Sequence, residues 1–219
     1  MVFLDRSEAG RLLGARLSPY ANREDILVLA LPRGGVPVGL EVARALNAPL
    51  DVFVVRKLGA PGQEELAIGA ISSGGVRLLN QATIHALGIS RGQVEAITQR
   101  EAQELERRER LYRGNRDAPE MRGKTVLVVD DGLATGLTMR AAIQALRQKE
   151  PKEIIAAVPV ASSSACREVE KEADAVICLS TPPEFFALGQ WYRNFSPVGD
   201  AAVRELLDRA GIPVADNPS

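Results

Sequence analysis

The stretch Val-Val-Asp-Asp-Gly-Leu-Ala-Thr-Gly-Leu-Thr-Met, residues 128–139, decides the fold of this chain. It overlaps the apolar run 126–129, whose length and branched side chains are typical of a buried parallel strand. Apolar residues after Thr138 recur at helical spacing to about Lys149. The polar residues between the two are therefore predicted to form a strand-to-helix turn at the carboxyl edge of a sheet, where open α/β folds bind ligands.

The composition of this turn indicates a site for a sugar phosphate. Gly132 and Gly136 let the backbone approach a ligand, and the start of the following helix offers unpaired N–H groups that suit a phosphate. The two threonine hydroxyls can bind the same anion. Asp130 and Asp131 precede this cradle at a distance suited to the vicinal hydroxyls of a sugar. The alternative interpretation is a simple helix cap beside solvated acids.

The turn is neither a P-loop, because no Lys follows Gly136, nor a G-x-G-x-x-G motif. It resembles the phosphoribosyl diphosphate (PRPP) motif of type I phosphoribosyltransferases, and it is especially similar to the adenine-type version. The resemblance implies transfer of ribose 5-phosphate from PRPP to a nitrogen nucleophile, such as a nucleobase or similar planar ring, with release of pyrophosphate. Two alternatives are a PRPP- or nucleotide-binding sensor without transfer activity and a hydrolase that handles phosphoribosyl groups.

The same resemblance implies a fold and a division of the chain. We expect an α/β fold with a five-stranded parallel sheet, helices on both faces, a small hood and a helical and hairpin elaboration. The chain is expected to form one domain, 1–219. Its core would comprise about 24–56 and 119–180, the elaboration 57–118, and the hood 1–20 and 181–219. The family is commonly dimeric, so a homodimer is implied.

The resemblance also implies roles for individual residues. The 5-phosphate would be bound by Gly132, Leu133, Ala134, Thr135, Gly136, Leu137 and Thr138. The ribose hydroxyls and Mg²⁺, the latter through water, would be held by Asp130 and Asp131. Pyrophosphate would be received by Arg33, Gly34, Arg56 and Lys57, and the catalytic set would be Asp130, Asp131, Arg33 and Lys57. Because the hypoxanthine–guanine type has an Asp where this chain has Ala134, a 6-oxopurine acceptor is disfavoured.

A second strand–turn–helix unit supplies part of this set. The predicted strand 26–31 runs into Pro32–Pro37, and a helix is expected from Pro37 to Leu46. The turn could be an ordinary tight turn with an exposed Arg33. In the family it corresponds to the pyrophosphate loop, which often contains a non-proline cis peptide, and the matching bond is Arg33–Gly34.

Arg56 and Lys57 end the next predicted strand, 50–55, and are interpreted as a cation pair for the leaving group or as solvated charges. The family resemblance implies a mobile loop over the site at 58–66, and its glycines and proline also favour a loop. Glu64 or Glu65 could act there as an acid or base, or simply be solvated. A hairpin is predicted around 73–75.

Two further segments leave alternatives open. The helix 90–113 is dense in charge with a thin apolar stripe, which predicts either a solvated arm or one that binds a partner. Five of the nine aromatic residues lie between 185 and 195. They could form a wall for a planar acceptor, made of Phe185, Phe186, Trp191 and Tyr192, or a small core that holds the C-terminal helix 200–210.

Composition excludes several other classes of function. The chain has 219 residues, 46% of them hydrophobic, and a formal net charge of −1, so no basic field suggests nucleic acid or an anionic membrane. Cys166 and Cys178 have no second pair, which argues against a zinc site or a disulfide framework. The chain shows no signal-peptide pattern and no run of apolar residues long enough to span a bilayer, so we expect a cytoplasmic protein.

Overall fold

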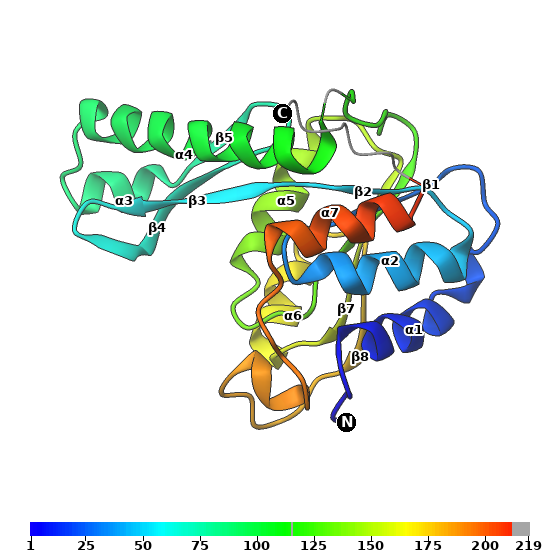
Figure 1. Cartoon of the computed structure of the whole chain (residues 1–219). Helices are drawn as coiled ribbons and strands as arrows, with labels where there is room; N and C mark the ends of the chain where they lie inside the picture. Colours follow the sequence, from blue (N-terminus) through cyan, green and yellow to red (C-terminus); the bar gives the residue numbers. More distant parts are fainter. Residues whose placement is uncertain (115, 212–219) are drawn as a thin grey trace.

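A computed structural model describes residues 1–114 and 116–211, and for Glu65 it describes only the backbone. It confirms the predicted α/β fold with a five-stranded parallel sheet (Figure 1). The strand order is β2-β1-β6-β7-β8. The strands are β1 (Ile26–Ala30), β2 (Leu50–Val52), β6 (Thr125–Val129), β7 (Glu153–Val160) and β8 (Ala175–Ser180).

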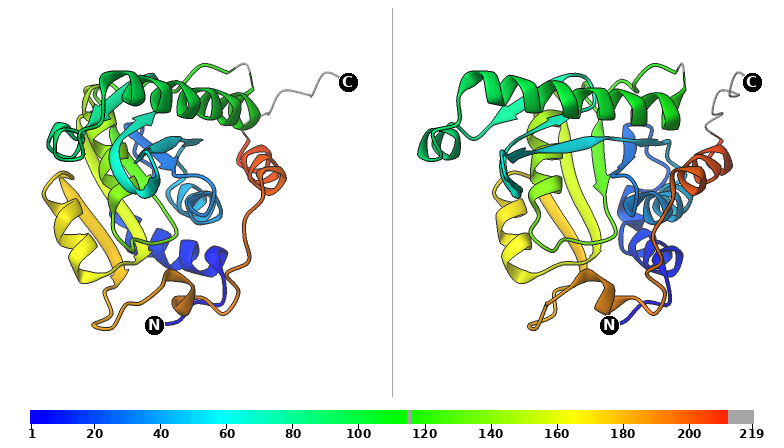
Figure 2. Two further views of the ribbon diagram at one scale, coloured as in Figure 1. Left: turned by 90° about the vertical axis from the view of Figure 1, so that its left-hand side faces the viewer. Right: turned by 60° about the vertical axis from the view of Figure 1, so that its left-hand side comes forward.

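Helices cover both faces of this sheet, and the strands β1 and β6 are therefore buried along their whole length. Alternate residues of a strand point to opposite faces. On one face Val28 packs with α1 (Arg6–Arg16), α2 (Gly35–Leu46) and α7 (Asp200–Arg209). On the other face Leu29 packs with α5 (Leu137–Arg147) and α6 (Ser163–Glu170). Figure 2 shows helices on both sides of the sheet.

A second, antiparallel sheet corrects two expectations about 50–66. Its strands are β3 (Val55–Ala60), β4 (Gln63–Ser72) and β5 (Val76–Leu79). The expected strand 50–55 is divided between β2 and β3, and the expected mobile loop 58–66 is a β3–β4 hairpin. Gly62 makes the tight turn with φ +71°, and the Cβ of any side chain at Gly59 would lie 2.8 Å from Cα of Glu64. These residues therefore serve a close strand pairing and not a loop. The predicted hairpin at 73–75 is confirmed as the β4–β5 turn.

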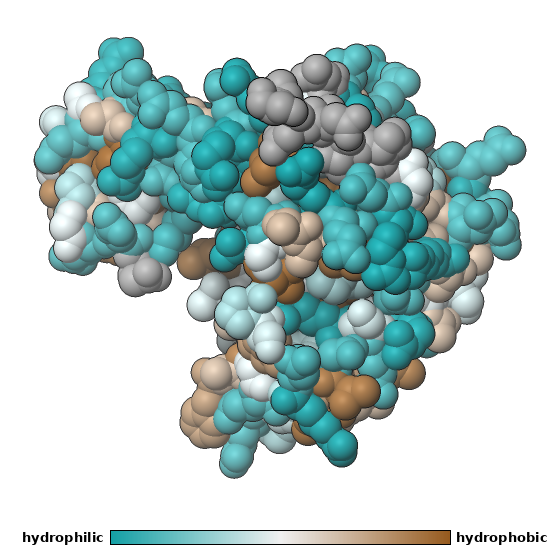
Figure 3. Space-filling view, viewed as in Figure 1, coloured by the Kyte–Doolittle hydropathy of each residue, from teal (hydrophilic) through white to brown (hydrophobic). Residues whose placement is uncertain are grey.

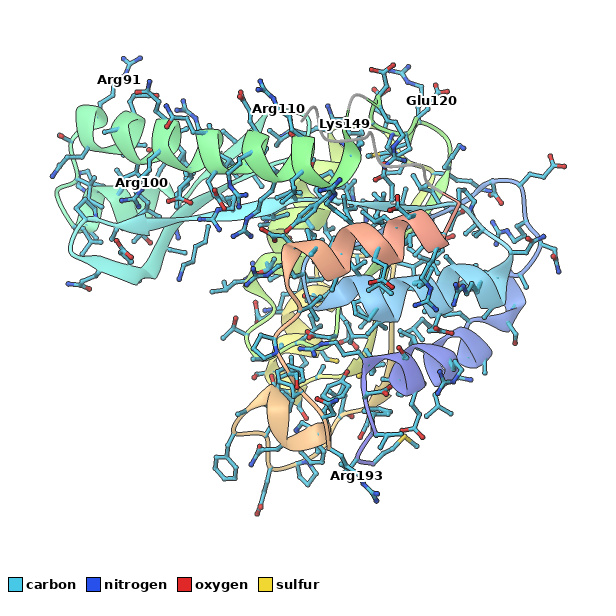
Figure 4. The ribbon with its side chains drawn as sticks, in the orientation of Figure 1. Arg91, Arg100, Arg110, Glu120, Lys149 and Arg193 are labelled. Atoms are coloured by element: carbon cyan, nitrogen blue, oxygen red, sulfur yellow. The ribbon has the colours of Figure 1, made fainter. Side chains whose placement is uncertain are left out.

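The predicted charged arm is α4 (Arg91–Arg113), which follows the short helix α3 (Gln81–Ala86) and lies over β3–β5. Figure 4 shows Arg91 and Arg110 projecting from the outer side of α4. The C-terminal end of α4 is anchored in the body. Tyr112 is fully buried and its hydroxyl donates to Asp200 at 2.5 Å, while Arg113 forms a buried ion pair with Asp51 at 3.1 Å. The arm is thus solvated on its outer side but fixed at one end, and in Figure 3 it overhangs the body.

The N-terminal segment 1–6 and the segment 185–196 meet beyond the sheet and form a small cap, which we call the hood. The backbone N–H of Phe3 donates to the carbonyl of Trp191, and that of Arg193 donates to the carbonyl of Phe3, both at 2.8 Å. A cluster centred on Phe3 and Tyr192 fills the space between these segments. Two 3₁₀ helices, η1 (Ser18–Tyr20) and η2 (Leu188–Trp191), complete the described elements. None of the helices in the described ranges is both long and apolar enough to cross a bilayer.

Candidate functional site

Two strand-to-helix turns lie side by side at the carboxyl edge of the sheet, because β1 and β6 are neighbouring parallel strands. Their backbones approach so closely that no side chain fits between them. A Cβ on Gly35 would lie 2.7 Å from the carbonyl oxygen of Val129, and a Cβ on Gly34 would lie 2.6 Å from Cγ of Asp131. The glycines of the first turn are therefore required by the acidic pair of the second.

The acidic pair is held in a fixed arrangement. Asp130 is half-buried, and its Oδ1 accepts the backbone N–H of Asp131 at 2.8 Å. Oδ2 of Asp131 accepts Nε of Arg6 at 2.7 Å, and both of these side chains are almost completely buried. Burial, followed by the neighbouring carboxylate, raises the pKa of Asp130 well above its usual range. Burial also raises the pKa of Asp131, although Arg6 opposes the shift.

The two carboxylates alone do not complete the coordination shell of a metal ion. Within residues 1–114 and 116–211, this edge of the sheet included, no group of three or more His, Cys, Asp or Glu side chains converges to hold a metal. Mg²⁺ commonly keeps several waters and binds one or two carboxylates together with substrate phosphates. The donor set is therefore compatible with Mg²⁺ that arrives with a phosphorylated substrate.

The predicted phosphate turn is open on its outer side. Gly136 adopts the left-handed conformation (φ +73°) before α5, and the side chains of Thr135 and Thr138 are exposed. Within the described part of the chain, the N–H groups of Thr135, Gly136 and Thr138 have no hydrogen-bond acceptor. Leu133 differs, because it is buried and its N–H donates to the carbonyl of Val160 at 2.9 Å. Its N–H is therefore already bound, whereas the others can meet an anion.

The start of α6 fixes the shape of this turn. Ser162 caps the helix by accepting the N–H of Ala165 at 3.1 Å. Its hydroxyl also donates to the carbonyl of Ala134 at 2.8 Å. Ser162 thus caps α6 and also holds the middle of the phosphate turn.

The four residues predicted to receive pyrophosphate do not all come together. Gly34 lies beside the acidic pair, whereas the side chain of Arg33 faces α7, with its Nη1 3.6 Å from Asp200. The cis peptide joins Pro32 and Arg33, one bond before the expected Arg33–Gly34 bond. Gly34, which directly precedes α2, already has helical torsion angles. The turn that links β1 to α2 therefore ends at Arg33.

Arg56 and Lys57 separate because neighbouring residues of a strand point to opposite faces. Arg56 binds Glu101 of α4 at 2.5 Å and so joins β3 to the arm. Lys57 and Thr138 line the same cavity, which has a volume of about 360 Å³ and lies between the second sheet and α5. The other lining residues are Val55, Ala67, Gly69, Ala70, Leu78, Leu79, Asn80, Leu137, Arg140, Ala141 and Gln144. The structure thus brings Lys57, but not Arg56, to the phosphate turn.

The aromatic segment 185–195 was predicted to form either a wall for a planar acceptor or a small core, and it has features of both. The ring of Tyr192 packs on Phe3 and Phe195, with centroids 5.5 and 5.1 Å away, and its hydroxyl donates to the carbonyl of Asp131 at 2.5 Å. Tyr192 therefore belongs to a small core, which holds the N-terminal segment and not α7 as expected. Phe185 stacks on Trp191 with centroids 6.3 Å apart. A cavity of about 340 Å³ beside them is lined by Pro182, Pro183, Glu184, Phe186, Gln190 and Trp191.

Arg6 is a site residue that the sequence did not reveal. It lies 125 positions before its partner Asp131 and carries no motif of its own. Arg6 lies in the first turn of α1, and its neighbours in the sequence do not distinguish it from an ordinary surface arginine. Only the folding of the N-terminal helix against the sheet edge brings it to the acidic pair.

The chain is similar to known proteins along most of its length. A family model described as phosphoribosyl transferase domain matches residues 7–193. Two Mycobacterium tuberculosis proteins provisionally named phosphoribosyl transferases, MT0597 of strain CDC 1551 and Rv0571c of strain H37Rv, are each 44% identical over 209 residues. The match covers 95% of this chain but 47% of theirs, so the chain spans about half the length of these curated relatives.

Two solved structures are similar in fold. TT1426 of Thermus thermophilus is 40% identical with a TM-score of 0.83, and the match covers 94% of this chain and 98% of that one. AQ2163 of Aquifex aeolicus is 16% identical with a TM-score of 0.50, and the match covers 91% and 84% of the two chains. The second likeness concerns the fold alone.

Proposed function

Because the chain belongs to the phosphoribosyl transferase domain family, we propose that it transfers ribose 5-phosphate from PRPP to a nitrogen nucleophile and releases pyrophosphate. The observation that supports this most directly is the meeting of three features at one sheet edge. These are the acidic pair of half-buried Asp130 and buried Asp131, the glycine turn that contains Arg33, and the open turn that ends in Thr138. A cytoplasmic location and a homodimer remain predictions.

Different residues of the chain would bind different parts of PRPP. Backbone N–H groups from Thr135 to Thr138, with the two threonine hydroxyls, would hold the 5-phosphate. The acidic pair would bind the ribose, and with the substrate phosphates it would hold Mg²⁺ through water. When bound, Mg²⁺ would neutralise charge on the pyrophosphate.

In the proposed reaction the acceptor nitrogen forms a bond to C1 of the ribose while the bond from C1 to pyrophosphate breaks. Positive charge develops on the sugar ring in the transition state, and negative charge grows on the leaving group. Arg33 and Lys57 would stabilise the leaving pyrophosphate, and the acidic pair would keep the ribose oriented. The acceptor is proposed to be a planar nitrogen heterocycle other than a 6-oxopurine, since Ala134 offers no carboxylate to it.

Release of pyrophosphate tests the proposal. The protein would be incubated with PRPP, Mg²⁺ and, one at a time, a panel of planar nitrogen heterocycles that includes adenine, orotate and 6-oxopurines. We expect pyrophosphate release with at least one acceptor and none without an acceptor, and the Asp130→Asn variant serves as the inactive control. Release without any acceptor would favour a hydrolase. Tight PRPP binding with no release across the panel would favour a sensor instead.

A further inference from the structure

Arg6 makes three contacts that join the hood to the acidic pair. Its Nε donates to Oδ2 of Asp131 at 2.7 Å, and its Nη1 donates to the carbonyl of Ser196 at 2.9 Å. The guanidinium carbon lies 3.9 Å from the centroid of the Phe195 ring, within the range of a cation–π contact. Only 11% of the side chain is exposed. The guanidinium is therefore held in one place by the hood itself.

Asp131 is correspondingly engaged by the protein. Its backbone N–H donates to Asp130, and its carbonyl accepts the hydroxyl of Tyr192 at 2.5 Å. Its carboxylate is bound by Arg6 on one side and lies against Gly34 on the other. Two of these contacts, from Arg6 and Tyr192, come from the hood. Asp131 thus has little freedom to turn toward a substrate, whereas Asp130 is less buried.

We propose that Arg6 is a positioning residue of this site: it fixes the Asp131 carboxylate and neutralises its charge. Asp130 then becomes the acid that meets the ribose hydroxyls. This inference rests on the proposed function, because it concerns how PRPP is bound. It divides the pair into one acid that faces the substrate and one that joins the hood to the sheet edge.

The charge of PRPP explains why this neutralisation matters. PRPP is a polyanion, and its phosphates must lie within a few ångströms of two adjacent carboxylates. An unpaired carboxylate in a partly desolvated site repels such a ligand more strongly than it would in water. We expect Arg6→Met, which keeps much of the apolar packing but removes the charge, to weaken PRPP binding about tenfold, or about 1.4 kcal/mol.

A double-mutant cycle separates this role from a purely structural one. PRPP binding in the presence of Mg²⁺ would be measured by calorimetry for the wild type, Arg6→Met, Asp131→Asn and the double variant. If Arg6 acts through Asp131, its replacement weakens binding about tenfold in the wild-type background but less than twofold beside Asn at position 131. Arg6→Lys should recover part of the affinity. The matched control is Arg193→Gln, a hood arginine whose side chain points outward (Figure 4).

Each other outcome contradicts a specific part of the account. Failure of the wild type to bind PRPP would overturn the proposed function. Binding by the wild type, with equal affinity in Arg6→Met or an equal loss in both backgrounds, would overturn only the role of Arg6. Complete loss of binding in Asp131→Asn alone would do the same, because Asp131 would then be the direct ligand. If Arg6→Met fails to fold, Tyr192→Phe can replace it, because that variant removes only the hydroxyl that holds Asp131. We expect Tyr192→Phe to weaken PRPP binding about threefold. Unchanged PRPP affinity in Tyr192→Phe would count against the proposal.

Discussion

Replacement of Gly34 by Ala tests how closely the two turns depend on each other. Gly34 has φ −61° and ψ −34°, torsion angles that alanine adopts without strain. The added methyl group is therefore the only new feature. It would lie 2.6 Å from Cγ of Asp131, and still closer to Oδ2.

The magnitude follows from this distance. Ordinary contact begins at 3.4 Å, so the Asp131 carboxylate must move by at least about 0.8 Å. Overpacking of this kind typically costs about 1–3 kcal/mol. The shift also strains the hydrogen bond from Arg6, and hydrogen bonds to charged groups contribute about 1.5–3 kcal/mol. We expect Gly34→Ala to lower the free energy of unfolding by about 2–4 kcal/mol and to weaken PRPP binding at least about tenfold.

Urea denaturation and calorimetry with PRPP measure the two effects. Gly92→Ala in α4 is the matched control, because a Cβ there meets no atom within 4 Å and the residue lies inside a helix. That variant should gain about 0.5–1 kcal/mol from its helix propensity and leave PRPP binding unchanged. If Gly34→Ala has wild-type stability and wild-type affinity for PRPP, the close packing of Gly34 against Asp131 is not what shapes the site.

Two further predictions concern charges near the site. The hydrogen bond from Tyr112, with help from Arg33, lowers the pKa of Asp200, so its contribution to stability is present above the ordinary value of 3.8 and is lost as the pH falls below it. Between about pH 6 and about pH 3 the wild type should lose more unfolding free energy in urea titrations than Asp200→Asn, and equal losses would contradict this. Lys57→Gln should weaken PRPP binding about tenfold because Lys57 shares a cavity with Thr138. Arg56→Gln should leave that affinity within about twofold and instead lower stability, since Arg56 binds Glu101; a larger calorimetric loss for Arg56→Gln than for Lys57→Gln would reverse the assignment.

Local sequence patterns were sufficient to predict the main strand–turn–helix unit, whereas the five-stranded sheet was predicted from the resemblance to the family. The apolar run before Asp130 and the helical spacing after Thr138 specify a strand–turn–helix unit without any tertiary information. The capping serines Ser90 and Ser162 mark helix starts in the same way. These signals depend on neighbours within a few positions, which is why they can be read from one sequence.

Features that depend on distant contacts could not be predicted in this way. Gly59 and Gly62 favour a loop when read locally, but the pairing of β3 with β4 turns them into parts of a hairpin. The separation of Arg56 from Lys57 depends on the arm that supplies Glu101. Arg6 joins Asp131 only because the N-terminal helix packs across the sheet edge. Such contacts are set by tertiary packing, which local propensity does not encode.

The most direct test of the central claim is the affinity of PRPP for the Asp130→Asn, Asp131→Asn double variant, measured by calorimetry in the presence of Mg²⁺. Circular dichroism and thermal unfolding would first verify that the variant is folded. The account predicts that the wild type binds PRPP with Mg²⁺ and that the folded double variant shows no measurable binding. Equal affinity in the two proteins would contradict the claim that a sugar phosphate binds where β6 leads into α5.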